Sequence, residues 1–376
     1  MTHRRLTVAI PARDEAAYVV RALEALARQV GFDGRPLGGG LFDVVVFANN
    51  CRDDTANAVR RFASHSPQMA TYVIESDLPP HAAHVGMARR AVLDWSARRF
   101  SDEGRNDGIL ASTDADTVVA PDWVAWTLRE MVGVDAVAGF VDIDVFERQR
   151  LMAPVRLLYA RERAYRRALA ELEAVLDPQP EDPLPRHASF VGASFAVTTR
   201  AYLAGGGLPP LAALEDLAFC AALRRIDARV RHSMHVRATT SARRQTHVHD
   251  GFGAFIATLH ERADHLQSVT VVHAERSIGQ ITARAALRRL WRGARDAGDI
   301  ASVSAILGAP AQAWQPLLAR NVPFGRVYER IIDRVAGRRA VYPSQSVEEA
   351  TIALCNACAS AKAAMPMRTT AASGAG

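Results

Sequence analysis

Residues Ile109–Asp116 read Ile-Leu-Ala-Ser-Thr-Asp-Ala-Asp, and this stretch decides the predicted fold. Its first four residues, Ile109–Ser112, form a short and mostly apolar run, which is typical of a strand buried in a parallel sheet. Two carboxylates one residue apart, Asp114 and Asp116, follow at once. Ligands of α/β sheets bind beyond the carboxyl ends of the strands. The stretch therefore predicts a buried strand that leads directly into a binding site.

The chain before this stretch repeats the same alternation of short and long segments. The short ones are continuously apolar and are predicted to be strands: Leu6–Ile10, Phe42–Phe47 and Ala70–Ile74. The long ones carry apolar residues at helical spacing: Ala16–Val30, Thr55–His65 and Ala82–Phe100. This alternation predicts an α/β fold with a mostly parallel sheet and helices on both of its faces.

Polar residues follow three of the four predicted strands. These clusters are Pro11–Glu15, Asn49–Asp54 and Thr113–Asp116, and each contains carboxylates or amides. Because the strands are expected to be parallel, the three clusters should meet at one edge of the sheet.

The second part of the chain is predicted to be richer in helix. In order, we expect a long helix at Leu151–Leu176, a proline-rich loop at Asp177–Pro185, a strand at Ser189–Thr198, a glycine turn at Gly205–Gly207 and a helix that opens at Glu215 and Asp216. Beyond His249 the chain should be mainly helical, and the small, polar residues from about Pro366 should be disordered.

Composition excludes several classes of protein. The 376 residues carry a net charge of +6 that is spread along the chain without a dense basic stripe, so no nucleic-acid partner is expected. Lys362 is the only lysine and lies near the C-terminus, which argues against a Walker phosphate loop and against Schiff-base chemistry. The lone Cys355-x-x-Cys358 pair is interpreted as two buried residues on one helix face.

Membrane insertion is not expected from the sequence. The apolar run Leu6–Ile10 ends at Pro11 and is too short for a signal peptide, and no stretch is long enough to cross a bilayer. We expect a cytoplasmic protein without a transmembrane segment, and peripheral contact with a membrane stays open.

Asp114 and Asp116 are the predicted metal ligands. Carboxylate oxygens suit the hard cations Mg²⁺ and Mn²⁺, which readily share their ligands with a diphosphate. Such a cation would neutralise the charge on a departing nucleoside diphosphate. The alternative is a turn whose aspartates cap the helix that begins near Trp123. The position directly after an apolar strand favours the metal.

Glu215 and Asp216 are the predicted catalytic pair. A carboxylate can accept the proton of an acceptor hydroxyl as that hydroxyl attacks a sugar. The alternative is that two acids in the first turn of a helix are simply stabilised by the helix dipole. The glycines that precede them allow a close approach of the backbone to a ligand, which favours the catalytic interpretation.

Taken in order, these motifs resemble those of family 2 glycosyltransferases with the GT-A fold. Val8–Glu15 resembles the "IPARNE" opening, Val44–Thr55 the "DNxSxDxT" loop and Asp114–Asp116 the D-x-D motif, while Val191–Leu217 resembles the acceptor-side "G…a…GG…ED" segment. The likeness extends from about Leu6 to Arg244. The chain departs from the pattern at Ala48 and Cys51, and it lacks the Q-x-x-R-W motif, so a processive polymer synthase is not expected.

The resemblance implies a role for each matching residue. Pro11, Arg13 and Glu15 would line the nucleotide pocket, Asn49 and Asp53 would lie near base and ribose, Asp114 and Asp116 would serve diphosphate and metal, and Asp216, with Glu215 as the next candidate, would be the base of an inverting transfer. A third metal ligand would come from His232, His235, His247 or His249, and His247 and His249 are preferred. An arginine within Thr240–Arg244 would contact the diphosphate or face solvent.

The resemblance also implies an organisation and a set of partners. Residues 1–249 would form the catalytic domain, with a nucleotide-sugar half to about 120 and an acceptor half from about 121, followed by a helical region at 250–365 and a tail at 366–376. The donor would be a nucleotide-sugar, and the acceptor a hydroxyl on a small or lipid-linked molecule. A homodimer stays open.

Two other functions are alternatives for this sequence. A sugar nucleotidyltransferase should carry a glycine-rich loop with a lysine after the first strand, and Pro11–Glu15 has neither. A non-catalytic sugar-nucleotide-binding or scaffold protein remains an alternative, although the intact Asp114–Asp116 and Glu215-Asp216 pairs argue against it.

Overall fold

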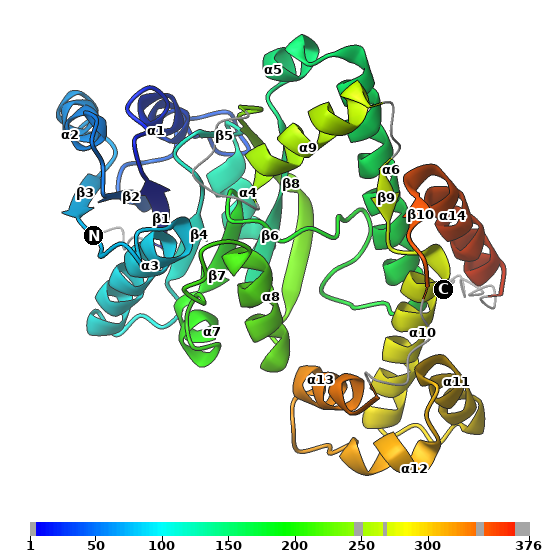
Figure 1. Ribbon diagram of the computed structural model, residues 1–376. Helices are drawn as coiled ribbons and strands as arrows, with labels where there is room; N and C mark the ends of the chain where they lie inside the picture. The colour runs from blue at the N-terminus through cyan, green and yellow to red at the C-terminus, as the bar shows by residue number, and fades with distance from the viewer. Residues whose placement is uncertain (1–4, 244–250, 266–268, 336–341, 365–376) are drawn as a thin grey trace, which may run out of the picture.

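An eight-stranded sheet forms the centre of the protein (Figure 1). A computed structural model describes residues 5–243, 251–265, 269–335 and 342–364. The strand order is β3-β2-β1-β4-β7-β6-β8-β5. The strands are β1 (Leu6–Ala12), β2 (Phe42–Asn49), β3 (Thr71–Ser76), β4 (Ile109–Ser112), β5 (Thr117–Val119), β6 (Ala136–Ile143), β7 (Phe195–Thr198) and β8 (Val230–Thr240). β1 to β4 pair in parallel, whereas β7 and β5 are antiparallel to their neighbours.

Strands β1, β2 and β4 are buried along their whole length because both faces of the sheet are covered. In β1, Val8 and Ile10 pack into the core on one face, and Ala9 packs into the core on the other. The first face carries α1 (Val19–Ala27), α2 (Thr55–His65) and α4 (Trp123–Glu130). The opposite face carries α3 (Val85–Asp102), α7 (Thr199–Ala204) and α8 (Glu215–Arg225). The predicted α/β sheet with helices on both faces is confirmed.

One predicted strand is much shorter than expected. Of the run Ser189–Thr198, only Phe195–Thr198 forms a strand, β7. The residues before it turn back on themselves, since the Ser194 amide donates to the carbonyl oxygen of Val191 at 3.2 Å. The alternating apolar pattern of this segment therefore reflects burial in two different settings, a turn and a strand.

A second, mainly helical part lies beside the sheet (Figure 1). It is built along α6 (Ala153–Leu176), which follows the short α5 (Val145–Arg150). Its other helices are α9 (Phe252–Asp264), α10 (Ala274–Trp291), α11 (Ala297–Leu307), α12 (Ala311–Trp314) with the 3₁₀ turn η1 (Gln315–Leu317), α13 (Phe324–Val335) and α14 (Val347–Ala364). A short ribbon pairs β9 (Thr270–Val271) with β10 (Gln345–Ser346). The predicted tail at 366–376 lies outside the described residues.

This helical part has its own apolar cores. One core joins α6, α9, α10 and α14, and another joins the end of α10 to α11, α12 and α13. α13 also contacts the sheet part of the molecule, because Asp227, just after α8, accepts hydrogen bonds from the Phe324 and Gly325 amides at 2.6 and 2.8 Å. Among the helices that the structure describes, none is long and apolar enough to cross a membrane.

Candidate active site

A cavity of about 530 Å³ lies at the carboxyl ends of β1, β2 and β4. It is bordered on the other side by α6 and by the segment 186–193. Of the residues predicted from sequence, the following line it: Pro11, Arg13, Glu15, Asn49, Asp114, Asp116, Glu215 and Asp216. We refer to it as the catalytic cavity. Its position is the one that a strand-end binding site requires.

Asp53, which the resemblance assigns to the base and ribose, lies outside the lining of this cavity. Its carboxylate accepts hydrogen bonds from the Ala16 amide at 3.0 Å and from the Thr55 amide at 3.0 Å. Asp14 makes a similar contact with the Arg52 amide at 2.7 Å. The two aspartates thus hold the loops after β1 and β2 against each other.

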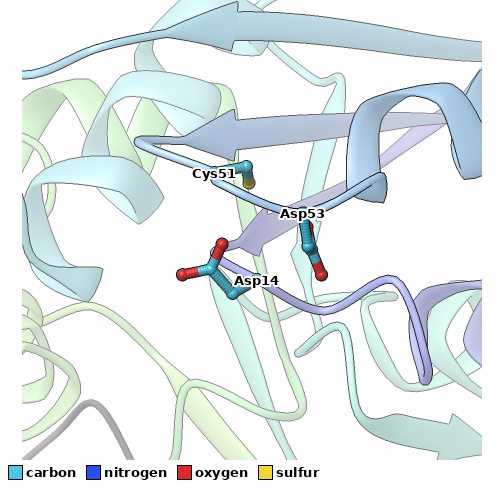
Figure 2. A group of neighbouring side chains, drawn as sticks. All are labelled: Asp14, Cys51 and Asp53. Atoms are coloured by element: carbon cyan, nitrogen blue, oxygen red, sulfur yellow. The ribbon is translucent and has the colours of Figure 1, made fainter.

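The same loops bring together Asp14, Cys51 and Asp53, whose ligand-type atoms lie within 4.8 Å of one another (Figure 2). This group is not a good cation site. Both carboxylates already accept backbone hydrogen bonds, and burial raises the pKa of the Cys51 thiol, which disfavours the thiolate that binds metals. We interpret the group as a structural contact that fixes the loops after β1 and β2 relative to each other.

Asp114 and Asp116 follow β4 and enter the catalytic cavity. The Asp114 side chain is one-third exposed, whereas that of Asp116 is mostly buried. Burial and the neighbouring Asp114 carboxylate raise the pKa of Asp116 to about 6, although the Arg243 guanidinium at 3.0 Å opposes the shift. Ionisation of Asp116 is therefore disfavoured in this cavity.

Arg89 links the acidic motif after β4 to the acidic pair that opens α8. Its guanidinium is buried and donates to Asp114 Oδ1 at 2.8 Å and to Glu215 Oε1 at 3.1 Å, and also to the Ser112 hydroxyl and the Gly192 carbonyl oxygen. Gly192 has to be glycine here, because a Cβ atom would lie 2.6 Å from the Arg89 Cζ atom. Sequence reasoning missed Arg89 altogether.

Arg243 contacts a different pair of acids in the site from the pair that Arg89 contacts. It forms a two-bond ion pair with Glu15 and contacts Asp116, and its guanidinium lies 4.8 Å from the centre of the Tyr18 ring. Of the two alternatives stated for this segment, the structure places Arg243 inside the cavity rather than facing solvent. Arg244 lies outside the described residues.

The two acids that open α8 have unlike surroundings. Glu215 is buried, and this burial raises its pKa even though Arg89 lowers it. Asp216 is half-buried in the cavity wall, and its carboxylate accepts a hydrogen bond from the Gly192 amide at 2.9 Å. Glu215 is thus fixed in an ion pair, while Asp216 has no cationic partner among the described ion pairs and is the better placed of the two to take a proton.

The four histidines considered as a third metal ligand divide into two groups. His232 is buried against Asp182, with Nδ1 2.7 Å from Oδ2, and His235 stacks on Trp126. Neither lines the catalytic cavity. His247 and His249 lie outside the described residues.

The helix α6 forms the far side of the catalytic cavity and differs in chemistry from the strand ends. It presents Tyr159, Glu162 and three arginines, Arg163, Arg166 and Arg167. Nearby His187 is neutral, because burial lowers its pKa to about 3. The helix side is thus mainly basic, whereas the strand-end side is mainly acidic.

Fold and cavity together define an α/β protein with a carboxylate-rich ligand site at its strand ends. The sequence model of the family described as "Glycosyltransferase like family 2" matches residues 3–256. The match covers more than half of the chain, which therefore belongs to this family and is a glycosyltransferase. The predicted family and the predicted GT-A fold with a mainly helical C-terminal region are confirmed.

Two solved structures with a similar arrangement are distant in sequence. A mannosyltransferase from Pyrobaculum calidifontis, in complex with GDP-Man and Mn²⁺, is 17% identical over 96% of this chain and 81% of that one, with a TM-score of 0.46. TarS 1–349 from S. aureus, in complex with UDP-GlcNAc, is 14% identical over 90% and 93%, with a TM-score of 0.47. These likenesses are too low to transfer a donor or an acceptor. No curated protein matches the chain.

Proposed function

We propose that the protein transfers a sugar from a nucleoside-diphosphate donor to an acceptor hydroxyl, with inversion at the anomeric carbon and with a divalent cation. The observation that carries the proposal is that Asp114, Asp116 and Asp216 line one cavity at the strand ends. Burial and the neighbouring Asp114 raise the pKa of Asp116, and a carboxylate whose ionisation is disfavoured in this way is stabilised by a cation.

The residues present fit Mg²⁺ or Mn²⁺. These cations are commonly held by one or two carboxylates and complete their coordination with water and substrate phosphates. Asp114 and Asp116 supply such a pair, and the exposed part of Asp114 keeps an oxygen accessible although Arg89 holds the other. When bound, the cation would act as a Lewis acid that neutralises charge on the leaving diphosphate.

The remaining groups suit binding and proton transfer. Arg13, Glu15 and Asn49 border the strand-end half of the cavity and would bind the nucleotide. The buried Arg13 Nε and Asn49 Oδ1 atoms lack a hydrogen-bond partner among the described residues, which suits contact with a ligand. Arg243 would contact the diphosphate.

Asp216 would act as the base. As the acceptor oxygen bonds to the anomeric carbon, the bond from that carbon to the diphosphate breaks and its electron pair leaves with the diphosphate. The hydroxyl proton passes to the Asp216 carboxylate. The amide of Gly192, 2.9 Å from Asp216 Oδ2, would orient that carboxylate.

Calorimetric titration with UDP-, GDP- and dTDP-sugars, with and without Mn²⁺, tests the donor and the metal together. We expect one nucleotide series to bind more tightly with Mn²⁺, and Asp116→Asn to abolish this enhancement. Asp107→Asn is the matched control, because exposed Asp107 precedes the opposite end of β4. Mn²⁺-enhanced binding that survives in Asp116→Asn would contradict the metal assignment, and binding without any transfer would favour a non-catalytic sugar-nucleotide-binding protein.

A further inference from the structure

A second cavity, of about 600 Å³, adjoins the catalytic cavity along α6. It lies between α6, the β9–β10 ribbon and the first turn of α10. Four residues line both cavities: Glu162, Arg166, Ala188 and Ser189. Each volume is within the range of about 300–1,000 Å³ that is usual for ligand sites. The two cavities therefore adjoin each other along α6, and we refer to the two together as the path from Asp216 to Arg276.

The charges along this path are mainly positive. Arg163 and Arg167 border the catalytic cavity, Arg166 borders both cavities, and Arg276 of α10 borders the second cavity. In the second cavity, Glu162 is the only acid among the described lining residues, and it is paired with Arg166. The path thus offers cationic groups to a ligand that has already passed the acidic strand ends.

Two of these arginines form no ion pair with the part of the chain that the structure describes. Arg167 and Arg276 are exposed and have no ion-pair partner among the described residues. By contrast, nearby Arg186 is buried and paired with both Glu173 and Asp182. Guanidinium groups suit phosphate because their planar set of donors can bind two of its oxygens at once.

The rest of the second cavity suits an organic ligand rather than a lone ion. Tyr165 and Tyr342 line it, and the Tyr342 ring stacks on His273 with 5.5 Å between ring centres. Ser189 and Ser344 add hydroxyl groups. Apolar and aromatic walls with a few polar groups are typical of sites for small molecules.

We propose that the acceptor is an extended molecule whose reacting hydroxyl lies at Asp216 and whose phosphate group lies in the second cavity, bound by Arg276. Arg167 would attract the same phosphate as it passes the mouth of the path. This inference rests on the proposed transfer reaction, because it assigns the acceptor of that reaction. A phosphate on a soluble glycan and a phosphate on a lipid carrier share this chemistry.

The primary test is a titration of inorganic phosphate followed by ³¹P NMR. The protein is first saturated with diamagnetic Mg²⁺ and the nucleoside diphosphate found by calorimetry, so that the strand-end half is filled. We expect saturable binding of phosphate that weakens about tenfold or more in Arg276→Gln, since charge-assisted hydrogen bonds are lost. Arg98→Gln is the control, because Arg98 is an exposed arginine of α3 that borders neither cavity.

Each outcome is decisive. No saturable binding, or equal weakening in Arg276→Gln and Arg98→Gln, would overturn the phosphate site. If no nucleoside diphosphate binds, the proposed transfer reaction fails, and the titration of the nucleotide-free protein still reports on the second cavity.

The same variants identify the source of the phosphate. Sugar phosphates are compared with vesicles that contain a polyprenyl phosphate, each against its dephosphorylated counterpart. An Arg276-dependent preference for the phosphorylated member of a pair identifies its class. Arg276 would then affect the KM for the acceptor and leave donor affinity unchanged.

Discussion

The two sides of the catalytic cavity contain similar numbers of arginines in unlike states. At the strand ends, Arg89 and Arg243 are each held by two carboxylates. Along α6, Arg167 has no such partner among the described residues, Arg166 is held by one carboxylate, that of Glu162, and Arg163 lies 3.8 Å from Asp142 and donates to the Val141 carbonyl oxygen. The comparison teaches that the arginines of a cavity have two roles. An arginine that is paired with carboxylates is part of the scaffold, whereas an arginine without such a partner is available to a ligand.

The largest effect is expected on the acidic side, at Asp216. In Asp216→Asn the amide is nearly isosteric and can still accept the Gly192 hydrogen bond, but it cannot take a proton. We expect the rate of transfer to fall by about 10²–10⁴, while calorimetric affinity for the donor stays unchanged. A turnover close to that of the wild type would move the base elsewhere.

The second effect tests whether Arg89 belongs to the scaffold. Arg89→Met leaves the buried Glu215 carboxylate without a cation and should lower the free energy of unfolding by about 3–5 kcal/mol. Adding Glu215→Gln removes the unpaired buried carboxylate and should recover most of the free energy of unfolding that Arg89→Met loses. Urea unfolding of the two variants measures both values. A loss of less than about 1 kcal/mol in Arg89→Met would show that the pair is not structural.

The third effect concerns pH and follows from Asp116. Its pKa rises from 3.8 to about 6 on folding, so the folded protein binds this proton more tightly than the unfolded chain. The contribution of this proton to the free energy of unfolding is complete below about pH 4 and is lost as the pH rises through 6. Metal-free Asp116→Asn should therefore be more stable than the wild type by about 3 kcal/mol at pH 8 and equal to it at pH 4.

Thermal unfolding in EDTA at the two pH values measures this difference. Added Mn²⁺ should reduce it by stabilising only the wild type. A variant that is less stable than the wild type at pH 8 would contradict the raised pKa of Asp116.

The smallest effects compare one arginine from each side. Arg167→Gln removes a group without a protein partner and should change the free energy of unfolding by less than about 0.5 kcal/mol. Arg243→Gln removes the partner of Glu15 and should cost about 1–3 kcal/mol. Equal costs in chemical unfolding would remove the distinction between scaffold and available arginines.

The strand-end side of the cavity was largely predictable from the sequence. Strands β1, β2 and β4 are short apolar runs, and the polar residues that follow them have to meet at one edge of a parallel sheet. This argument needs no knowledge of side-chain partners. It brought Glu15, Asn49 and Asp114 into one cavity, but it did not foresee that Asp53 turns away to join two loops.

Arg89 was missed because its partners are remote in sequence, at positions 114 and 215. A signal was nevertheless present. Arg89 is followed at helical spacing by the buried Val92, Leu93 and Ser96, so it lies on the apolar stripe of α3. A charged residue on such a stripe needs a buried partner. The second cavity had no comparable signal, because it depends on how distant helices pack beside α6.

The contact between α8 and α13 limits how this chain can change. α13 begins so close to the end of the helix that carries Asp216 that a Cβ atom on Gly325 would lie 1.8 Å from the carbonyl oxygen of Arg224. Arg225 and Glu329 form an ion pair across the same junction. The C-terminal helices are therefore fitted to this particular helix end and cannot be exchanged as an independent module. A graft that replaces them has to supply a glycine at 325 and a partner for Asp227.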